Sequence, residues 1–320
     1  MAAIYIYLSH KNGVLDETAL ELVTAAKAID AAAQATAIVL GAAGEAEQAA
    51  KEAAQSFATV WCVANDALAQ PNAEIARKVL LAIVPAGSIV LAANDTFAMD
   101  LTPGLSIKMG ASFASDATGI EGVEDGKLKV VRQEYGGAVS TRSLADLTGG
   151  AVITVRAGAF APDESKSAGG QVVDKSGEVS DFSSKRTFVK IIEAETGDVD
   201  ITKSEVLVAV GRGIEEEDNI GMVHDLAKAM GADVCCSRPI VDAKWLEKAR
   251  QVGTSGQTVK PKVYLALGIS GSFQHMGGIK GNPFIVAVNK NPNAPIFQTA
   301  DVGVVADILD FIPLLQEKIG

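Results

Sequence analysis

The residues best suited to binding chemistry lie in the stretch GISGSFQHMGGIKG, residues 268–281, where five of fourteen residues are glycine. Glycines that follow a strand allow backbone N–H groups to approach an anion closely. The spacing matches neither the Gly-x-Gly-x-x-Gly dinucleotide fingerprint nor a Walker loop, because GGIKG does not end in Lys-Ser or Lys-Thr. Taken alone, the stretch is as compatible with a tight strand-to-helix turn as with a binding loop. The adjacent Gln274 and His275 are not needed in a phosphate loop and require another explanation.

Other polar or glycine-rich loops follow apolar runs in the same part of the chain. They are GRG at 211–213, CSRP at 236–239, QVGTSG at 251–256, Asn289 after FIVAV, and Asp301 and Asp307 near the final helix. Each has an ordinary explanation by itself, because most charged residues simply face solvent. In an open parallel sheet, however, the loops at the carboxyl ends of the strands surround one ligand site. We therefore expect these loops to form a single site.

The elements that must position these loops alternate between strands and helices from residue 206 onward. Continuous apolar runs such as VLVAV (206–210) and VYLAL (263–267) predict strands of a parallel sheet that is covered on both faces. Gly231 is placed to end a helix over 217–231. The other expected strands cover 232–239, 283–289 and 294–301, and the other expected helices cover 243–253 and 305–319. This alternation predicts a doubly wound α/β domain.

The first half of the chain also predicts an α/β domain, with strands at 3–9, 35–41, 58–64 and 87–93 and a helix at 16–33. From 126 to about 195, the segments KLKVVRQEYGG, AVSTRSL, AVITVRAG and RTFVKIIEAE are rich in β-formers. Because some of them alternate apolar and polar residues, we expect an added antiparallel β segment on the same domain. The acidic stretch 193–205 has no strong apolar period and is the best linker candidate. We therefore expect an N-terminal α/β domain over 1–195 and a C-terminal domain over 196–320.

Composition argues against several classes of function. The net charge of −11 disfavours electrostatic binding to nucleic acid or to an anionic membrane surface. Three cysteines without a Cys-x-x-Cys spacing and three dispersed histidines predict neither a disulfide framework nor a metal site. No basic region precedes a long apolar run at the N-terminus, and no segment is long enough to span a membrane, so we expect a cytoplasmic location. The spacing suggests no Ser-His-Asp or Cys-His catalytic group.

Four separated motifs closely resemble those of the electron-transfer flavoprotein alpha subunit. The longest motif covers residues 263–307 and begins with VYLALGISGSFQHMGGIKG. The other three, GRGI, CSRPIVDA and QVGTSG, precede it in the same order as in the family. The strong resemblance covers 206–320, whereas the N-terminal half is compatible in length and pattern but less specific. The resemblance implies FAD bound mainly by the C-terminal domain. It also implies a beta subunit that completes a heterodimer, packs on the N-terminal domain and carries an AMP.

The resemblance also implies the residues that contact the cofactor. Arg212, Ser237, Ser270, Gly271, Ser272 and Phe273 match positions near the pyrophosphate, and Asn289, Asp307 and Ile308 match positions at the adenosine end. The stretch beside the flavin ring is matched by Val252, Gly253, Thr254 and Ser255. Arg238 matches the arginine over that ring, Gln274 matches the contact to the ribityl chain, and His275 matches the histidine near the C2 carbonyl. The family often has Gln-Thr where this chain has Thr254-Ser255. A hydroxyl is kept at Ser255, so its hydrogen bond to flavin N5 is expected.

These assignments explain the Gln-His pair. The negative charge of a reduced flavin spreads over N1 and the C2 carbonyl. A histidine donor at that carbonyl and an arginine over the ring stabilise this charge in a low-dielectric pocket. The resemblance thus implies that Gln274 and His275 tune the cofactor, and that no substrate carbon is activated.

The expected function is that of an electron carrier and not of an enzyme with its own substrate. Such a carrier accepts electrons from flavin dehydrogenases and passes them to a membrane quinone oxidoreductase or a comparable acceptor. Two alternatives stay open: a nicotinamide-nucleotide-binding subunit of a transhydrogenase-like enzyme, and a nucleotide-sensing binding module. The absence of the Gly-x-Gly-x-x-Gly fingerprint weighs against the first. The second depends only on the α/β pattern of the N-terminal half.

Overall fold

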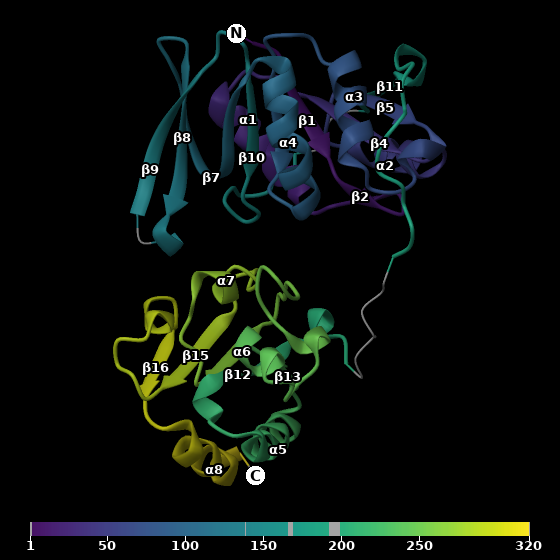
Figure 1. Ribbon diagram of the computed structural model, residues 1–320. Helices are drawn as coiled ribbons and strands as arrows, with labels where there is room; N and C mark the ends of the chain where they lie inside the picture. Colours follow the sequence, from purple (N-terminus) through teal and green to yellow (C-terminus); the bar gives the residue numbers. More distant parts are fainter. Residues whose placement is uncertain (1, 138, 166–168, 192–198, 320) are drawn as a thin grey trace. The chain divides into compact units, whose positions relative to one another are not determined.

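The computed structural model describes residues 2–137, 139–165, 169–191 and 199–319. Its internal contacts separate the chain into two units, Met1–Val189 and Lys190–Gly320 (Figure 1). The expected domain boundary between residues 195 and 196 lies outside the described residues, because 192–198 are not among them. Each unit has its own sheet and its own hydrophobic core.

The first unit is built on a nine-stranded sheet. Its order is β11-β5-β4-β1-β6-β10-β7-β8-β9, and its strands are β1 (Ile4–Leu8), β4 (Thr36–Gly41), β5 (Thr59–Ala64), β6 (Ile89–Ala93), β7 (Ser112–Glu124), β8 (Lys127–Glu134), β9 (Val139–Asp146), β10 (Ala151–Val155) and β11 (Gln171–Asp174). Four helices accompany it, α1 (Thr18–Ile29), α2 (Glu45–Ala53), α3 (Ala73–Ile83) and α4 (Thr96–Met109). A short hairpin of β2 (His10–Lys11) and β3 (Val14–Leu15) follows β1. The strands predicted near 3–9, 35–41, 58–64 and 87–93 and the helix predicted at 16–33 are all present.

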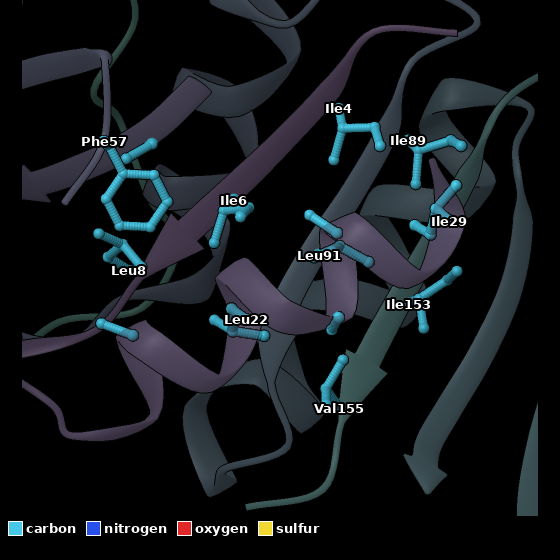
Figure 2. Close-up of a cluster of buried hydrophobic side chains, with 14 of the residues drawn as sticks. Ile4, Ile6, Leu8, Leu22, Ile29, Phe57, Ile89, Leu91, Ile153 and Val155 are labelled. Atoms are coloured by element: carbon cyan, nitrogen blue, oxygen red, sulfur yellow. The ribbon is translucent and has the colours of Figure 1, made fainter. Parts of the chain in front are cut away.

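The strands of this sheet form where apolar residues run without interruption. All five residues of β1, β6 and β10 are buried, as expected for strands covered on both faces. One apolar cluster joins these strands to α1 and α2, and a second joins them to α3 and α4. Figure 2 shows part of the first cluster, where Leu22 of α1 lies among side chains of β1, β6 and β10.

The added antiparallel segment is confirmed, with one correction. Strands β7, β8 and β9 pair antiparallel, as the alternation in KLKVVRQE and AVSTRSL predicted. AVITVRAG is different, because β10 inserts between β6 and β7 and runs parallel to both. The prediction of a β segment over 186–195 is wrong for 186–191, and 192–195 lie outside the described residues. Phe188, Val189 and Ile191 are exposed, so no sheet face is available to bury them.

The second unit is a five-stranded parallel sheet of order β13-β12-β14-β15-β16. Its strands are β12 (Val206–Val210), β13 (Asp233–Cys236), β14 (Val263–Leu267), β15 (Phe284–Asn289) and β16 (Val302–Val305), and its helices are α5 (Ile220–Met230), α6 (Arg238–Asp242), α7 (Phe273–Met276) and α8 (Ile308–Ile319). The chain leaves β12 toward β13 on one side and returns to β14 on the other, which is the doubly wound arrangement. Gly231 ends α5 in the left-handed conformation with φ 63°, as predicted.

One layer of this unit consists of loops where helices were expected. Helices α5 and α8 pack with the sheet in one apolar cluster. The other cluster contains Val252, Val259, Ile269 and Ile296, all from segments between strands. These loop segments therefore form part of the core, which restricts their motion and holds the candidate site.

Two predictions in this unit are wrong. Residues 243–253 do not form an α-helix, because α6 ends at Asp242, Lys244 has φ 62°, and a 3-10 turn covers Lys248–Arg250. Arg250 is buried there, and its guanidinium donates to the Val234 carbonyl (2.7 Å), which fixes this segment against β13. Residues 294–301 were expected to be a strand, but Pro295–Gln298 forms a 3-10 turn and β16 follows it. Proline cannot supply a ladder N–H and suits the first position of such a turn.

The predicted linker 193–205 is only partly described. Its residues 199–205 pack on the second unit, where a 3-10 turn covers Ile201–Lys203 and Ile201 is buried in the apolar cluster of the loop layer. The side chain of Asp200 accepts from Thr202 N and starts this turn. The segment from Val199 onward is therefore part of the second unit and not a linker.

Candidate functional site

The predicted site residues follow the strands of the second unit at their carboxyl ends. Arg212 follows β12, Ser237 follows β13, Ser270 follows β14, Asn289 ends β15, and Asp307 follows β16. Because all five strands are parallel, these ends lie at one edge of the sheet. The sheet thus gathers the loops in the way that the sequence predicted.

Glycines bring the loops after β12 and β14 into direct contact. Gly211 N donates to the Leu267 carbonyl (2.8 Å), and Gly213 N donates to the Gly268 carbonyl (3.2 Å). A Cβ added to Gly213 would lie 2.7 Å from the Gly268 Cα, a distance that no side chain tolerates. The close approach fixes the backbone on both sides of Arg212, whose side chain is exposed.

The two residues after β13 differ in environment. Ser237 is buried, and its N–H donates to the Val210 carbonyl at the end of the neighbouring strand (3.0 Å). Arg238 begins α6, and its side chain is 69% exposed with Nε 3.4 Å from Asp242 Oδ2. An exposed pair of this kind contributes little to stability. The guanidinium is therefore held at the edge of the sheet without being committed to the core.

The loop 252–255 is joined to the loop after β14. Thr254 N donates to the Gln274 carbonyl (2.8 Å). Gly253 has φ 144°, and a Cβ there would lie 2.8 Å from the same carbonyl oxygen. Val252 is buried beneath them, whereas Thr254 and Gln274 are exposed. The backbone of both loops is consequently fixed as one surface.

Ser255 is oriented by a residue that the sequence did not single out. Gln251 is buried, and its Nε2 donates to Ser255 Oγ (2.9 Å). Because Oγ accepts this hydrogen bond, the hydroxyl hydrogen remains available for donation to a ligand. Gln251 was quoted only as the first residue of QVGTSG, and nothing in its spacing marked its role.

His275 is a buried titratable group of the site. It is 5% exposed, its Nε2 lies 2.9 Å from the Tyr264 hydroxyl, and its buried Nδ1 has no hydrogen-bond partner among the described residues. Burial lowers the pKa of His275 to about 4, with a backbone interaction at Val252 opposing the shift. The imidazole is therefore neutral at pH 7. The sequence contained one partial signal for Tyr264, because its hydroxyl is the single polar side-chain group within the apolar run VYLAL.

The remaining predicted residues lie toward β15 and β16. Asn289 donates from Nδ2 to the Ile269 carbonyl (2.9 Å) and accepts at Oδ1 from Asn291 N (2.9 Å), so its amide holds the loop after β14. Asp307 Oδ1 accepts from Leu309 N (3.0 Å) in the first turn of α8. Ile308 is buried in the core, which leaves its backbone for contact with a ligand.

The loop 270–273 is tied to the segment before β16. Ile296 N donates to the Ser270 carbonyl (3.0 Å), and a Cβ on Gly271 would lie 2.5 Å from the Ile296 backbone. Ser272 Oγ accepts from His275 N (3.4 Å) and starts α7, which Phe273 enters as its first residue. These contacts place the loop directly before His275.

The donor set fits a flavin nucleotide. A buried imidazole nitrogen without a partner costs about 1–3 kcal/mol unless a ligand pairs with it. Here that nitrogen belongs to the loop after β14, and Gly213, Gly253 and Gly271 let the backbones of the neighbouring loops pack closely together. Exposed Arg212 and Arg238 supply positive charge at the same edge. A ring with a carbonyl acceptor and a phosphate-bearing tail would satisfy all of these groups.

Other features do not add a second chemistry. Within the described residues, no group of three or more His, Cys, Asp or Glu side chains could hold a metal ion. Burial raises the pKa values of Cys235 and Cys236, so both remain thiols at neutral pH. A hollow of about 650 Å³ is lined by His224, residues 241 and 244–248, and Arg250, and none of the predicted cofactor-binding residues lines it.

Family models match both units. The model described as electron transfer flavoprotein domain matches residues 4–180. The model described as electron transfer flavoprotein FAD-binding domain matches residues 200–280, which include the loops after β12, β13 and β14. The second match ends before Asn289, Asp307 and Ile308.

Several curated proteins are similar to this chain over most of its length. A probable electron transfer flavoprotein subunit alpha, mitochondrial, of Cryptococcus neoformans var. grubii is 32% identical, over 100% of this chain and 92% of that protein. Protein FixB of Escherichia coli O81 is 37% identical over 73% of this chain and 74% of its own. The LctC subunit of a lactate dehydrogenase (NAD(+),ferredoxin) of Acetobacterium woodii is 33% identical over 78% of this chain and 59% of its own.

In the part of the chain that the structure describes, no helix combines the length and the apolar character needed to cross a bilayer.

Proposed function

The chain belongs to the electron transfer flavoprotein alpha-subunit family, and on this premise we propose that it binds FAD at the carboxyl edge of its second sheet. It carries electrons from flavin-containing dehydrogenases to an acceptor such as a membrane quinone oxidoreductase. The observation that carries the proposal is the buried Nδ1 of His275, in the loop after β14, which has no hydrogen-bond partner among the described residues. A carrier needs no substrate site of its own, in line with the absence of a catalytic group from the sequence pattern.

The bound flavin would supply the electron chemistry, and the residues of this chain would hold it and set its affinity for electrons. Ser255 has a hydroxyl hydrogen that can be donated to a ring acceptor, and His275 contributes a buried Nδ1 that has no hydrogen-bond partner among the described residues. Arg238 adds a positive charge at the edge of the sheet. Fixed donors and charges of this kind stabilise negative charge with little reorganisation when an electron arrives.

The loops would also bind the nucleotide tail. Arg212 is exposed beside the Gly211 and Gly213 contacts, where its fork-shaped guanidinium suits a pyrophosphate. The loop 270–273 brings backbone and serine groups to the same edge. Lys290, paired with Glu215 (2.6 Å) and 4.0 Å from Asp307, marks the side of β15 and β16 where the adenosine end is proposed to lie.

A heterodimer is part of the proposal. Family membership supports a beta subunit as the partner, and we propose that this subunit packs on the first unit and carries an AMP. The printed name of the LctC relative places that protein in a lactate dehydrogenase that uses NAD(+) and ferredoxin. The donor and acceptor of this chain therefore have to be identified by experiment.

Co-purification tests the proposal directly. The chain is expressed with its beta subunit, and the complex is examined by visible spectroscopy before its cofactors are released and identified. We expect a yellow complex that yields FAD from this chain and AMP from its partner. A colourless complex that retains a nicotinamide nucleotide would instead favour the transhydrogenase-like alternative, and one that binds only an adenine nucleotide would favour a sensing module.

A further inference from the structure

A short chain of buried hydrogen bonds runs from the sheet to the candidate site. Tyr264, in β14, is fully buried, and its hydroxyl oxygen lies 2.9 Å from His275 Nε2. On its other side, the Cys235 thiol of β13 donates to the same oxygen (3.8 Å). Neither Tyr264 nor Cys235 was among the predicted site residues, yet both connect to the His275 ring, whose Nδ1 has no hydrogen-bond partner among the described residues.

The protons in this chain have a preferred direction. Burial raises the pKa values of Tyr264 and Cys235, so both keep their protons at neutral pH. A phenol has one proton to donate, and an imidazole nitrogen accepts it far better than a thiol sulfur does. The arrangement in which Cys235 donates to Tyr264 and Tyr264 donates to His275 Nε2 therefore uses each group in its stronger role.

We propose that Tyr264 is a positioning residue that fixes His275 in the tautomer with its proton on Nδ1. A neutral imidazole carries one N–H, and the nitrogen that accepts a hydrogen bond is the one without it. Nδ1, buried and without a described partner, thereby becomes a donor. This inference rests on the proposed function: the Nδ1 donor is then available to a carbonyl of the bound flavin. The lone pair of the imidazole lies on Nε2, where it accepts from Tyr264 and does not repel that carbonyl.

The opposite direction makes a distinct prediction. If His275 donated from Nε2 to the Tyr264 oxygen, the bare Nδ1 would present a lone pair to the ligand and could accept but not donate. The two arrangements share the same distances, so the location of a single proton separates them. The tautomer is thus the quantity to measure.

Nitrogen NMR on histidine-labelled protein reads the tautomer without any electron-transfer assay. The chain has three histidines, His10, His224 and His275, so few signals appear, and a His275→Asn variant identifies the one of interest. The full chain is studied in its complex, first with flavin removed and then loaded. We expect a protonated Nδ1 and an unprotonated Nε2 for His275 in both. A protonated Nε2 with a bare Nδ1 would overturn the proposal, whether or not FAD binds.

Substitutions then test whether Tyr264 is the cause. Tyr264→Phe keeps the ring and removes the donor, so we expect the His275 signal to shift toward the Nε2-protonated form and the potential of bound flavin to fall. Unchanged tautomer in a folded Tyr264→Phe complex would refute the role of Tyr264. If this variant does not fold, Cys235→Ala decides the matter, because loss of the thiol donor should broaden or shift the same signal. Cys236→Ala is its matched control, since Cys236 is equally buried but lies in the apolar cluster of α5 and α8.

Discussion

At the scale of single residues, the site combines one buried neutral donor with charges that stay near solvent. His275 is held inside the loop layer, whereas Arg238 is largely exposed and lies beside Asp242. The two are expected to act on the same flavin by different means. A hydrogen bond is short-ranged and directional, while a charge acts through the surrounding dielectric.

Replacing Arg238 with alanine should make the bound flavin harder to reduce. A unit charge at ~4 Å and an effective dielectric constant near 20 contributes about 4 kcal/mol, and solvent exposure of the guanidinium makes this an upper value. The potential is measured by dithionite titration of the complex. Lys248→Ala, which removes another exposed cation outside the predicted set, is the control and should leave the potential nearly unchanged. An unaltered potential in an FAD-bound Arg238→Ala complex would contradict the role of this charge.

His275 should also make the second unit sensitive to acid. Its pKa is about 4 in the folded chain against an ordinary 6.5, so between these values the unfolded chain binds the extra proton. Stability should therefore be complete above pH 6.5 and should fall as the pH is lowered toward 4. The full difference corresponds to about 3 kcal/mol.

Unfolding in urea at several pH values measures this effect. The chain has two tryptophans, Trp61 in the first unit and Trp245 in the second, so Trp61→Phe leaves a fluorescence signal from the second unit alone. The comparison is the pH slope with and without His275→Asn, because carboxylates titrate in both proteins. Equal slopes between pH 4 and 6.5 would show that His275 is not neutral by burial.

At the scale of elements, glycines decide how closely the loops of the site approach one another. Gly271 has φ 82°, and a Cβ there would lie 2.5 Å from the backbone of Ile296. Gly221, in α5, has open space where a Cβ would lie. The same substitution should therefore have opposite effects at these two positions.

Gly271→Ala should destabilise the second unit and weaken FAD binding. Backbone strain alone costs about 1–3 kcal/mol, and the collision with Ile296 adds to it. Gly221→Ala should stabilise the unit by up to about 1 kcal/mol, because alanine restricts the unfolded chain and favours a helix. Thermal unfolding and FAD titration of both variants measure the difference. Similar melting temperatures for the two would mean that the loop after β14 can move away from Ile296.

At the scale of the whole molecule, each unit has its own core but the chain has no covalent staple. The three cysteines are free and buried. Several apolar side chains are exposed on the first unit, including Tyr135 in the turn between β8 and β9 and Val139 and Leu144 in β9. A partner that packs on this segment would remove such side chains from water. The family's beta subunit is the expected partner.

Expression of the chain without its beta subunit should therefore give a protein that binds FAD poorly or aggregates. The visible spectrum after gel filtration reports retained flavin, and the elution volume reports association. Co-expression with the beta subunit is the matched control and should restore a stable yellow complex. A monodisperse, FAD-saturated monomer from the chain alone would show that the partner is not needed for cofactor binding.

Several properties of this protein were determined by the sequence itself. Uninterrupted apolar runs predicted the parallel strands, because a strand covered on both faces has no polar side. Gly231 marked a helix end, and the motifs around residues 211, 237, 252 and 268 predicted the loops of the candidate site. These features depend on residue type and local spacing, which are fully present in the linear chain.

The tertiary structure alone decided which groups meet. Residues 243–253 have a helical pattern, but the buried Arg250 binds the Val234 carbonyl and a turn forms instead. Ile201 belongs to the second core, although the acidic composition of the residues around it predicted a linker. The pairing of Tyr264 with His275 depends on a strand and a loop that fold against each other, and no local period encodes it. Hydrogen bonds between separate elements arise only once the sheet has set their distance and direction, and for that reason the tautomer of His275 is a property of the fold.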